Sequence, residues 1–388
     1  MSDLTEDFDI VSSPDRRSGI EERWVSFQPY LLSKGYRLRP RYQPDWVPSW
    51  KNTTLRPARC EDSIDSMPIR VLDAIRIQDN LQVIIKMVVP SQKGREGQDE
   101  LTALQYFSTP PVKDHPSNHV VPCLDCFPIP GADSAHFIVM PLLGKYDYPQ
   151  FHNLAEVHAC LQQLFEASRL GIVTISHIGE AFIFSARGIL TEYAPSDIAS
   201  ANIMMDIRPL FDEPFHPVYH TLSLDIQRVI YPQYSRSEKD IRYYFIDLGY
   251  AKWFSDPNSP RLVSGNEARE RVPEQRSGRP YDPFFGDIYQ FGIVLLCDII
   301  PQVEVLTFLH PIATEMTQTD PTARPTLEKA RQAMDTVFLG LRGWKYRWPI
   351  LPKGAGFKAR LIFAIWGIAS EFKFWLKKIL QVLLQRRK

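Results

Sequence analysis

The middle of the chain carries polar residues of the types that phosphoryl transfer requires. Lys86 interrupts an apolar run rich in β-branched residues, and Glu100 lies in the next segment with a helical pattern. Farther along, Asp197 and Asn202 stand five positions apart, and Asp247 follows a short apolar stretch. Each feature alone is common in proteins, so the prediction depends on finding them together in this order.

Each of these residue types has a defined use in such a reaction. The transfer needs neutralised charge on the phosphate oxygens and a positioned hydroxyl, with little covalent work by the protein. An ammonium such as Lys86 can hold phosphates if a carboxylate such as Glu100 orients it. Asp197 can accept the proton of a substrate hydroxyl. Asn202 and Asp247 offer the oxygen ligands that Mg²⁺ prefers, so they could hold this ion.

Hydrophobic patterning indicates the elements that would position these residues. Strands are expected where β-branched and aromatic residues cluster, in the ranges 83–89, 137–140 and 243–246. Helices are expected where apolar residues recur at helical spacing, in the ranges 99–107, 155–170 and 287–300. Residues 1–19 are expected to form a loose leader, and residues 20–60 an extended segment on the surface. Glu96 and Asp99 lie close to Glu100 and remain alternatives for its role.

The ordered set of motifs resembles the protein kinase family. Asp197 and Asn202 match the Asp and Asn of the H-R-D-x-x-x-x-N loop, and Asp247-Leu-Gly249 matches D-F-G. Three later motifs are similar too. Val272-Pro-Glu274 resembles A-P-E, and Asp287 with Gly292 resembles the D-x-W-x-x-G helix. Arg324 resembles a late Arg of the family that pairs with the Glu of A-P-E. The resemblance covers roughly residues 23–345 and implies that Glu274 and Arg324 form a structural ion pair.

More closely, the chain looks like a fungal kinase-like family. The similar stretches are Tyr36–Tyr42, Asn202–Asp206, Phe215–Pro217 and Tyr244–Leu248. This resemblance implies an α+β, bilobal protein kinase-like fold with a small β-rich N-lobe and a larger helical C-lobe. The boundaries that it implies are a flexible leader in 1–22, the N-lobe in 23–143, the C-lobe in 144–345 and a basic amphipathic tail in 346–388.

The resemblance also assigns roles to the candidate residues. Asp197 would be the catalytic base, and Lys86, oriented by Glu100, would contact the phosphates of ATP. Asn202 and Asp247 would hold Mg²⁺. Asp287 would tie down the loop that carries Asp197 from a buried helix.

Several features depart from the kinase pattern. Residues 36–86 contain no glycine, so the G-x-G-x-x-G loop that lets the backbone approach phosphates is not recognisable. Pro195 and Ser196 replace the His and Arg before Asp197, which argues against regulation by a phosphorylated loop. Ala199 stands where Ser/Thr kinases often carry a Lys.

Two long stretches between the motifs are interpreted as insertions. One lies around residues 207–240. The other, residues 171–193, is either a genuine insertion or an intron retained in the gene sequence.

Three functions remain compatible with these residues. The leading hypothesis is an ATP-dependent protein kinase that acts on Ser or Thr hydroxyl groups of a protein substrate. The alternative is a pseudokinase, a nucleotide-binding or scaffold module, which the missing glycine loop favours. A small-molecule phosphotransferase on a related fold is a third hypothesis, which the motifs at Glu274 and Arg324 disfavour.

Composition narrows the class of protein. Lys plus Arg and Asp plus Glu both total 45, so nothing in the net charge favours nucleic acid as a partner. The acidic N-terminus lacks the pattern of a secretory signal, and the uncharged apolar stretch Leu361–Ala369 is too short to span a bilayer as a helix. We expect a cytoplasmic or nuclear protein with many loops, because 32 of its residues are proline.

The cysteines and several histidines are interpreted as structural. Five cysteines in so long a chain do not indicate a disulfide framework, and the pair Cys123 and Cys126 lacks the two further ligands of a zinc site. No motif makes His119, His152 or His177 part of a catalytic pair.

The C-terminal tail is amphipathic. Helical projection of residues 370–385 separates polar from apolar side chains, with Phe374 and Leu384 breaking the pattern. Peripheral contact with an anionic membrane through 361–388 and docking on the protein or on a partner are both compatible with this pattern.

Overall fold

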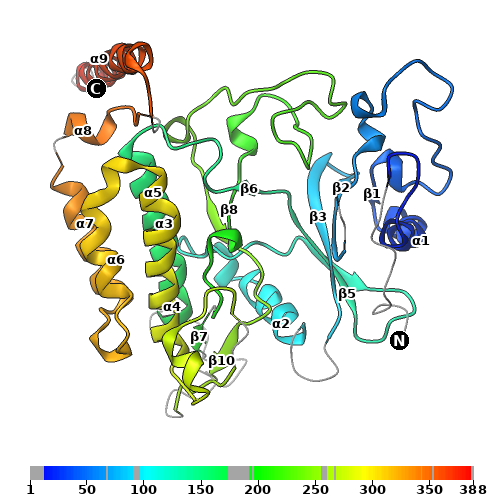
Figure 1. Cartoon of the computed structure of the whole chain (residues 1–388), viewed down its shortest axis with the longest axis horizontal. Coiled ribbons are helices and arrows are strands. Elements are labelled where there is room, and N and C mark those ends of the chain that lie inside the picture. Colours follow the sequence, from blue (N-terminus) through cyan, green and yellow to red (C-terminus); the bar gives the residue numbers. More distant parts are fainter. Residues whose placement is uncertain are drawn as a thin grey trace. The chain divides into compact units, whose positions relative to one another are not determined.

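The computed structural model describes residues 13–66, 69–90, 97–173, 192–194, 196–254, 260–265, 268–341, 343–351 and 354–385. They form a mixed α+β protein whose chain separates into two compact units (Figure 1). Unit 1 comprises Met1–His115, Val120–Gly144 and Asp206–Tyr234. Unit 2 comprises Pro116–His119, Lys145–Met205 and Ser235–Lys388.

Unit 1 is built on an antiparallel sheet. Its strands, in spatial order, are β1 (Tyr36–Arg37), β2 (Val71–Arg76), β3 (Leu81–Val88), β5 (His136–Pro141) and β4 (Asp125–Pro128). The strands expected in 83–89 and 137–140 are therefore confirmed. Val71 stands opposite Lys86, and Asp73 stands opposite Ile84. Because opposite residues and alternate residues share a face, these four side chains lie on the same face of the sheet.

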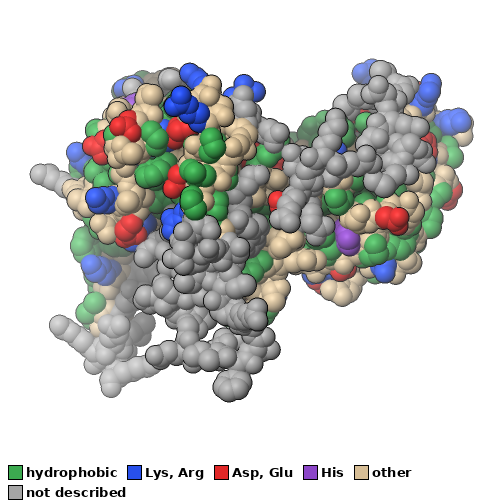
Figure 2. Space-filling view, turned by 90° about the horizontal axis from the view of Figure 1, so that it is seen from below, with side chains coloured by type: hydrophobic (Ala, Val, Ile, Leu, Met, Phe, Trp, Pro, Cys, Tyr) green, Lys and Arg blue, Asp and Glu red, His purple; other side chains and the backbone are tan. Residues whose placement is uncertain are grey.

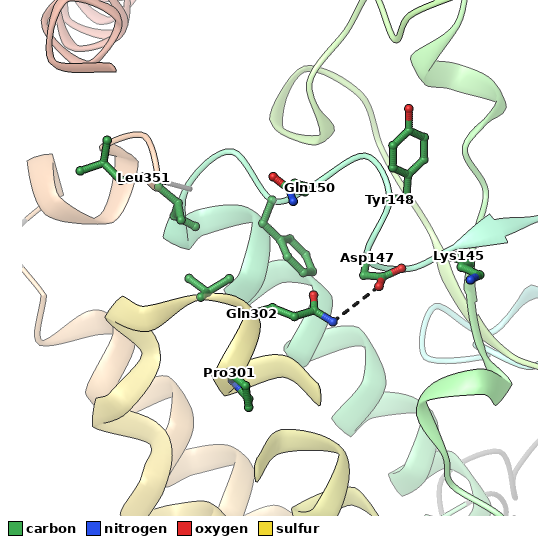
Figure 3. Close-up of a pocket in the computed structure, with 10 residues that line it drawn as sticks. Lys145, Asp147, Tyr148, Gln150, Pro301, Gln302 and Leu351 are labelled. Atoms are coloured by element: carbon green, nitrogen blue, oxygen red, sulfur yellow. Dashed lines mark hydrogen bonds between the residues drawn. The ribbon is translucent and has the colours of Figure 1, made fainter. Parts of the chain in front are cut away.

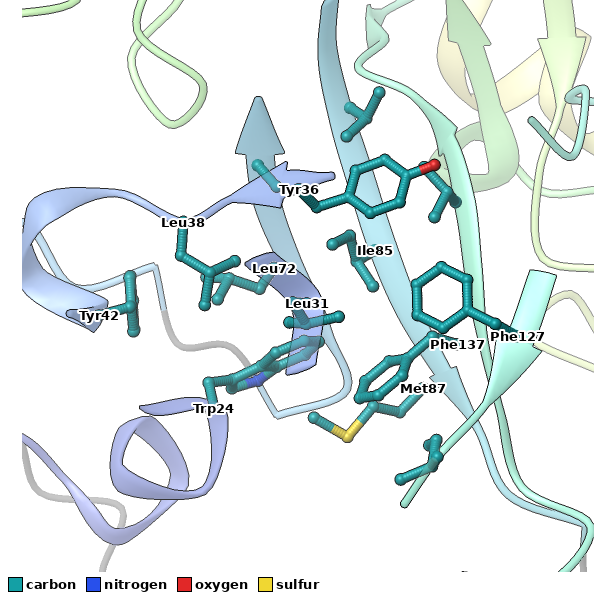
Figure 4. Packing of buried hydrophobic residues seen from close by; sticks show 14 of the residues in the cluster. Trp24, Leu31, Tyr36, Leu38, Tyr42, Leu72, Ile85, Met87, Phe127 and Phe137 are labelled. Atoms are coloured by element: carbon teal, nitrogen blue, oxygen red, sulfur yellow. The ribbon is translucent and has the colours of Figure 1, made fainter. Parts of the chain in front are cut away.

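The other face of the sheet carries the hydrophobic core of unit 1, against which α1 (Gly19–Ser33) packs (Figure 4). Trp24 from α1 is fully buried and lies 5.9 Å, centroid to centroid, from Phe137 of β5. The expectation that residues 20–60 are extended is wrong for this helix. Ser18 and Glu21 form a capping box that starts it, and Pro29 is tolerated inside it.

The rest of unit 1 consists of α2 (Gln98–Phe107), which confirms the helix expected in 99–107, and of irregular chain. The segment 206–234 belongs to this unit although it lies far along the sequence. Gln82 of β3 donates a buried hydrogen bond of 2.7 Å to the carbonyl of Phe215. Gln82 is two residues from Ile84, so the segment packs on the same face of the sheet as Lys86.

Unit 2 is mainly helical. Its helices are α3 (Leu154–Val173), α4 (Pro283–Ile293), α5 (Ile300–Gln302), α6 (His310–Met316), α7 (Leu327–Leu339), α8 (Gly343–Arg347) and α9 (Phe357–Gln385). A π-helical segment, Val294–Ile299, joins α4 to α5. The helices expected in 155–170 and 287–300 are confirmed.

Short strands complete the structure. β7 (Glu192–Ala194) pairs with β10 (Lys252–Phe254), and β8 (Ile203–Met205) pairs with β9 (Tyr243–Phe245), which confirms the strand expected in 243–246. β6 (Gly144–Lys145) lies where the chain passes from unit 1 to unit 2.

One helical run, Pro283–Gln302, is long and apolar enough to be considered for a membrane span. However, 67% of its most apolar stretch is buried inside the protein, as in the core helix of a soluble domain. Among the coloured residues in Figure 2, basic and acidic side chains are interspersed with hydrophobic ones.

Candidate functional site

Lys86 and Glu100 form an ion pair inside unit 1. Lys86 Nζ lies 2.5 Å from Glu100 Oε1, joining β3 to α2. The Lys86 side chain is 17% exposed and that of Glu100 8% exposed, so both partners of the pair are largely buried. The sequence predicted that a helix Glu orients this Lys, and the pairing itself is confirmed. Of the two alternatives to Glu100, Glu96 lies outside the described residues.

A cavity of about 430 Å³ lies against the face of the sheet that carries Lys86. Its walls include Val71, Asp73 and Ile84 from the sheet, together with Pro217 and Val218. The segment 206–234 therefore supplies one wall of the cavity, and it includes most of the insertion predicted around residues 207–240. The cavity is large enough for a small ligand, but its lining within the described residues includes none of the five candidate residues.

A rigid segment held by arginine follows β1 in the glycine-free part of the chain. Arg39 Nε donates to both oxygens of Asp73 at 3.0 and 2.9 Å, and its Nη1 donates to Glu61 at 3.0 Å. Burial by itself lowers the pKa of Arg39, but the charges of Asp73 and Glu61 raise it overall. Glu61 also lies 3.4 Å from Nε2 of the fully buried His216. The Glu61 carboxylate thus contacts both Arg39, in the segment after β1, and His216, in the segment 206–234.

Asp197 and Asn202 lie together on one loop of unit 2. Both amide hydrogens of Asn202 are donated to Asp197, to its carbonyl oxygen at 3.0 Å and to Oδ2 at 2.9 Å. Asp197 Oδ1 accepts a hydrogen bond of 2.7 Å from the backbone N–H of Arg269. Burial raises the pKa of the Asp197 carboxyl, the two hydrogen bonds oppose this, and the charge of Asp247 raises it further.

Asp247 lies beyond the end of β9 and is exposed. Its φ of 60° is in the left-handed region, and so is the φ of 60° at Ser196, next to Asp197. Non-glycine residues rarely adopt this conformation, and such backbone strain gathers at functional sites. The structure thus brings three predicted residues into one neighbourhood, because Asp247 interacts electrostatically with Asp197, which binds Asn202.

Helix α4 holds both sides of Asp197. Asp287 accepts from the backbone N–H of Ser196 at 2.8 Å, and Gln290, one turn later, accepts from that of Ile198 at 2.9 Å. The tie from Asp287 was predicted and is confirmed, and burial raises its pKa well above the ordinary value. Sequence reasoning missed Gln290. The available signal was a polar residue three positions after Asp287 in an otherwise apolar buried helix.

The donor set of this loop suits a cation that arrives with a ligand. Among the residues that the structure describes, no group of three or more His, Cys, Asp or Glu is arranged to hold a metal ion. However, Mg²⁺ usually takes one or two protein ligands plus substrate phosphates. Both neighbours of the Asn202 amide nitrogen are acceptors, so the amide is oriented with Oδ1 facing away from Asp197. Asn202 Oδ1 and the Asp247 carboxylate are oxygen ligands of the kind that Mg²⁺ prefers, so these two residues fit a magnesium ion that binds together with substrate phosphates.

Glu274 and Arg324 form the predicted structural ion pair. The two guanidinium nitrogens lie 2.7 and 2.8 Å from the two carboxylate oxygens, a bidentate geometry. The Arg324 side chain is fully buried and also donates to the carbonyls of Phe285 and Gln318. This prediction is confirmed.

Two of the three histidines have structural contacts. His119 is buried, and its Nδ1 lies 3.0 Å from the Tyr243 carbonyl, while its own carbonyl accepts from Phe245. Burial lowers the pKa of His119 to about 4, so the ring is neutral. His152 accepts a backbone hydrogen bond from Ile350. His177 lies outside the described residues, as does most of the stretch 171–193.

The cysteines carry free thiols. Cys123 Sγ lies 3.2 Å from the Asp125 carbonyl, and burial raises the pKa of this thiol to about 12. A thiol with so high a pKa is a poor metal ligand at neutral pH.

A second cavity, of about 650 Å³, lies in unit 2 between the segment before α3 and the end of α5 (Figure 3). Gln302 donates to Asp147 over 3.5 Å, and Lys145 and Tyr148 lie on the same segment as Asp147. Its lining within the described chain includes none of the five candidate residues. We therefore assign this cavity no part in the candidate chemistry.

Comparison with known proteins adds no relative. No protein-family model matches this sequence, and a search of curated proteins finds no significant match.

Proposed function

We propose that this chain has a bilobal protein kinase-like fold and transfers the γ-phosphoryl group of ATP to a Ser or Thr hydroxyl of a protein substrate. The observation that carries the proposal is the loop in unit 2, where Asp197 is oriented by Asn202, interacts with Asp247 and is held by α4. The ion pair between Lys86 and Glu100 in unit 1 supports it independently.

The roles follow from the chemistry of the side chains. Asp197 accepts the proton of the substrate hydroxyl, and its raised pKa makes it a stronger base than an ordinary Asp. Two of its lone-pair sites are used by Arg269 and Asn202, which leaves others for the hydroxyl. Lys86 contacts the phosphates while Glu100 holds its ammonium in place.

Asn202 Oδ1 and Asp247 would hold Mg²⁺ together with the phosphates of the nucleotide. When bound, the ion neutralises charge on the phosphate oxygens. The proposal requires Lys86 and Asp247 to contact the same nucleotide.

A pseudokinase is the second candidate, and two observations favour it. The Lys86 face of the sheet is partly covered by the segment 206–234, and the chain after β1 is held by Arg39 where a flexible glycine loop is expected. Both features restrict the approach of backbone N–H groups to phosphates. In this form the chain would bind nucleotide weakly or serve as a scaffold.

Transfer of label from γ-labelled ATP to a mixture of generic protein substrates tests the proposal. We expect wild-type activity, and a loss of at least about 100-fold in Asp197→Asn and Asp247→Ala. Glu213→Gln, which removes an exposed carboxylate paired with Arg228, is the matched control and should keep full activity. Label transfer that is equal in wild type and Asp197→Asn would overturn the assignment of the base.

A lysine-reactive acyl phosphate of ATP tests whether the two units share one nucleotide. Peptide mass spectrometry should find the label on Lys86 in wild type, and excess ATP with Mg²⁺ should compete for it. Asp247→Ala should weaken that competition. Label on Lys86 without phosphoryl transfer would favour the pseudokinase. Labelling of Lys86 that is unchanged by excess ATP and by Asp247→Ala would exclude a shared site.

A further inference from the structure

Helix α9 docks on unit 2 by its polar side. Glu371 forms a bidentate ion pair with Arg347 at 2.7 and 2.8 Å, and the Arg347 guanidinium lies 3.8 Å from the centre of the Phe374 ring. Gly367, the one buried residue along the described helix, packs on the Trp348 ring so closely that an added Cβ would lie 2.7 Å from it. Residues 367, 371 and 374 recur at helical spacing, so they form one stripe.

The opposite side of α9 is a broad apolar surface. Large hydrophobic side chains there are exposed along the whole helix, namely Leu361, Ile362, Ile365, Ile368, Phe372, Trp375, Leu376, Ile379, Leu380 and Leu383. Exposed fractions reach 71% at Phe372 and 64% at Ile368. A helix on the surface of a soluble domain normally buries its apolar side and leaves the polar side in water. Here the arrangement is reversed, and a continuous apolar surface of this kind indicates an interaction site.

Charge is also separated between this helix and the rest of the chain. Residues 357–388 contain eight Lys or Arg and one Glu, Glu371, which is paired with Arg347. The whole chain carries 45 residues of each sign, so the remaining residues have seven more acidic than basic side chains. The surface that fits α9 is therefore both apolar and negatively charged.

We propose that α9 is an interfacial anchor that lies in the headgroup region of an anionic lipid bilayer and holds unit 2 at the membrane. Trp375 and Trp366 are suited to the headgroup level, and Lys358 and Lys378 can extend to lipid phosphates. At 100° per residue, these exposed side chains span an arc of about 140° of the helix circumference. That is wider than the narrow seam that a second copy of the helix would cover in a coiled coil.

The dimensions fit a helix that lies on a bilayer. At 1.5 Å per residue its 29 residues extend roughly 43 Å. Within the described residues, α9 is long enough to span a membrane but does not meet the hydropathy and charge criteria of a span. α9 contacts α8 at the edge of unit 2 (Figure 1). Because the apolar side of α9 faces outward, the membrane would lie on the side of α9 that faces away from α8.

Vesicle flotation tests the anchor without using any activity. The full chain is mixed with vesicles of phosphatidylcholine alone or with about one third phosphatidylserine, and the floating fraction is measured. We expect binding to the anionic vesicles at least about tenfold stronger than to the neutral ones, and a decrease at high salt. Ile365→Glu with Phe372→Glu should abolish binding, and Lys358→Glu with Lys378→Glu should reduce it to the level of neutral vesicles.

Leu339→Glu is the matched control, because Leu339 is 76% exposed and belongs to α7, not to α9. This variant should float like wild type, and all variants should keep the wild-type melting temperature. Failure of wild type to float on anionic vesicles would overturn the proposal. So would a dimeric mass in light scattering that Ile365→Glu with Phe372→Glu converts to monomer, because the apolar surface would then bind a second copy.

Discussion

Asp287 and Gln290 hold the backbone of Asp197 from both sides. One carboxylate and one amide oxygen, three residues apart on α4, accept from the N–H groups of Ser196 and Ile198 at 2.8 and 2.9 Å. Gln290 also donates to the carbonyl of Glu270 at 2.9 Å. The orientation of Asp197 is therefore set by a buried helix, and not by its own loop alone.

Gln290→Leu should separate positioning from binding. The change keeps the approximate volume but leaves the N–H of Ile198 without its acceptor, at a cost of about 1–3 kcal/mol. We expect kcat to fall at least about tenfold while KM for ATP stays within about twofold, because Lys86 and Glu100 are untouched. Steady-state kinetics measure kcat and KM. A rise in KM for ATP as large as the fall in kcat would show that Gln290 does not act through Asp197.

Glu100→Gln should weaken the hold on nucleotide. The amide keeps the shape but loses the charge that faces Lys86 at 2.5 Å. We expect the dissociation constant for Mg-ATP to rise about tenfold, measured by the shift of melting temperature with ligand concentration. Asp99→Asn on the same helix is the control and should bind like wild type. If Asp99→Asn weakens binding instead, the roles assigned to the two acids are reversed.

Arg324→Ala should destabilise unit 2 without touching the reaction directly. The fully buried guanidinium pairs with Glu274 and satisfies two carbonyls, so its loss leaves a carboxylate without its partner. The expected decrease in the free energy of unfolding is about 3–5 kcal/mol by urea titration. Arg324→Lys should recover little of it, because a single ammonium cannot reproduce the bidentate geometry.

Two glycines of α4 offer a matched pair of substitutions. A Cβ at Gly292 would lie 2.7 Å from Thr317 and 2.9 Å from Met316, whereas at Gly286 the nearest atom is 3.5 Å away. Gly292→Ala should therefore cost about 1–3 kcal/mol by overpacking. Gly286→Ala should be neutral or stabilise by up to about 1 kcal/mol, because Ala is the better helix former. Equal unfolding midpoints would contradict this packing of α4 on α6.

His119 should make stability depend on pH. Its pKa of about 4 in the fold lies below the ordinary 6.5, so between these values the unfolded chain binds the proton and the folded chain does not. Stability is then fully present above pH 6.5 and is lost as pH falls toward 4, by on the order of 3 kcal/mol. His119→Asn keeps a donor for the Tyr243 carbonyl but cannot titrate. The difference between wild type and this variant should shrink as the pH falls, and a constant difference would exclude the histidine as the cause.

Some features of the protein could be predicted from neighbouring residues in the sequence. β-branched runs and helical spacing located β3, β5, α2, α3 and α4 because each pattern reports the burial of one local element. The resemblance of the ordered motifs to the protein kinase family also predicted which partners would meet, namely Lys86 with Glu100 and Glu274 with Arg324. Helix α1 was missed although Ser18 and Glu21 carry its start signal, because the many Arg and Pro residues around it favoured an extended segment.

Other features were decided only by the tertiary structure. The packing of residues 206–234 against the sheet depends on contacts such as that between Gln82 and Phe215, 133 positions apart, which no local pattern encodes. The role of Gln290 depends on which loop reaches α4. Helical projection divided α9 into two sides, but the ion pair of Glu371 with Arg347 selects the polar side for docking and leaves the apolar side exposed. The repeat of apolar residues in the sequence defines which residues share one side of a helix or strand. Whether that side faces the core or the solvent depends on partners that only folding brings close.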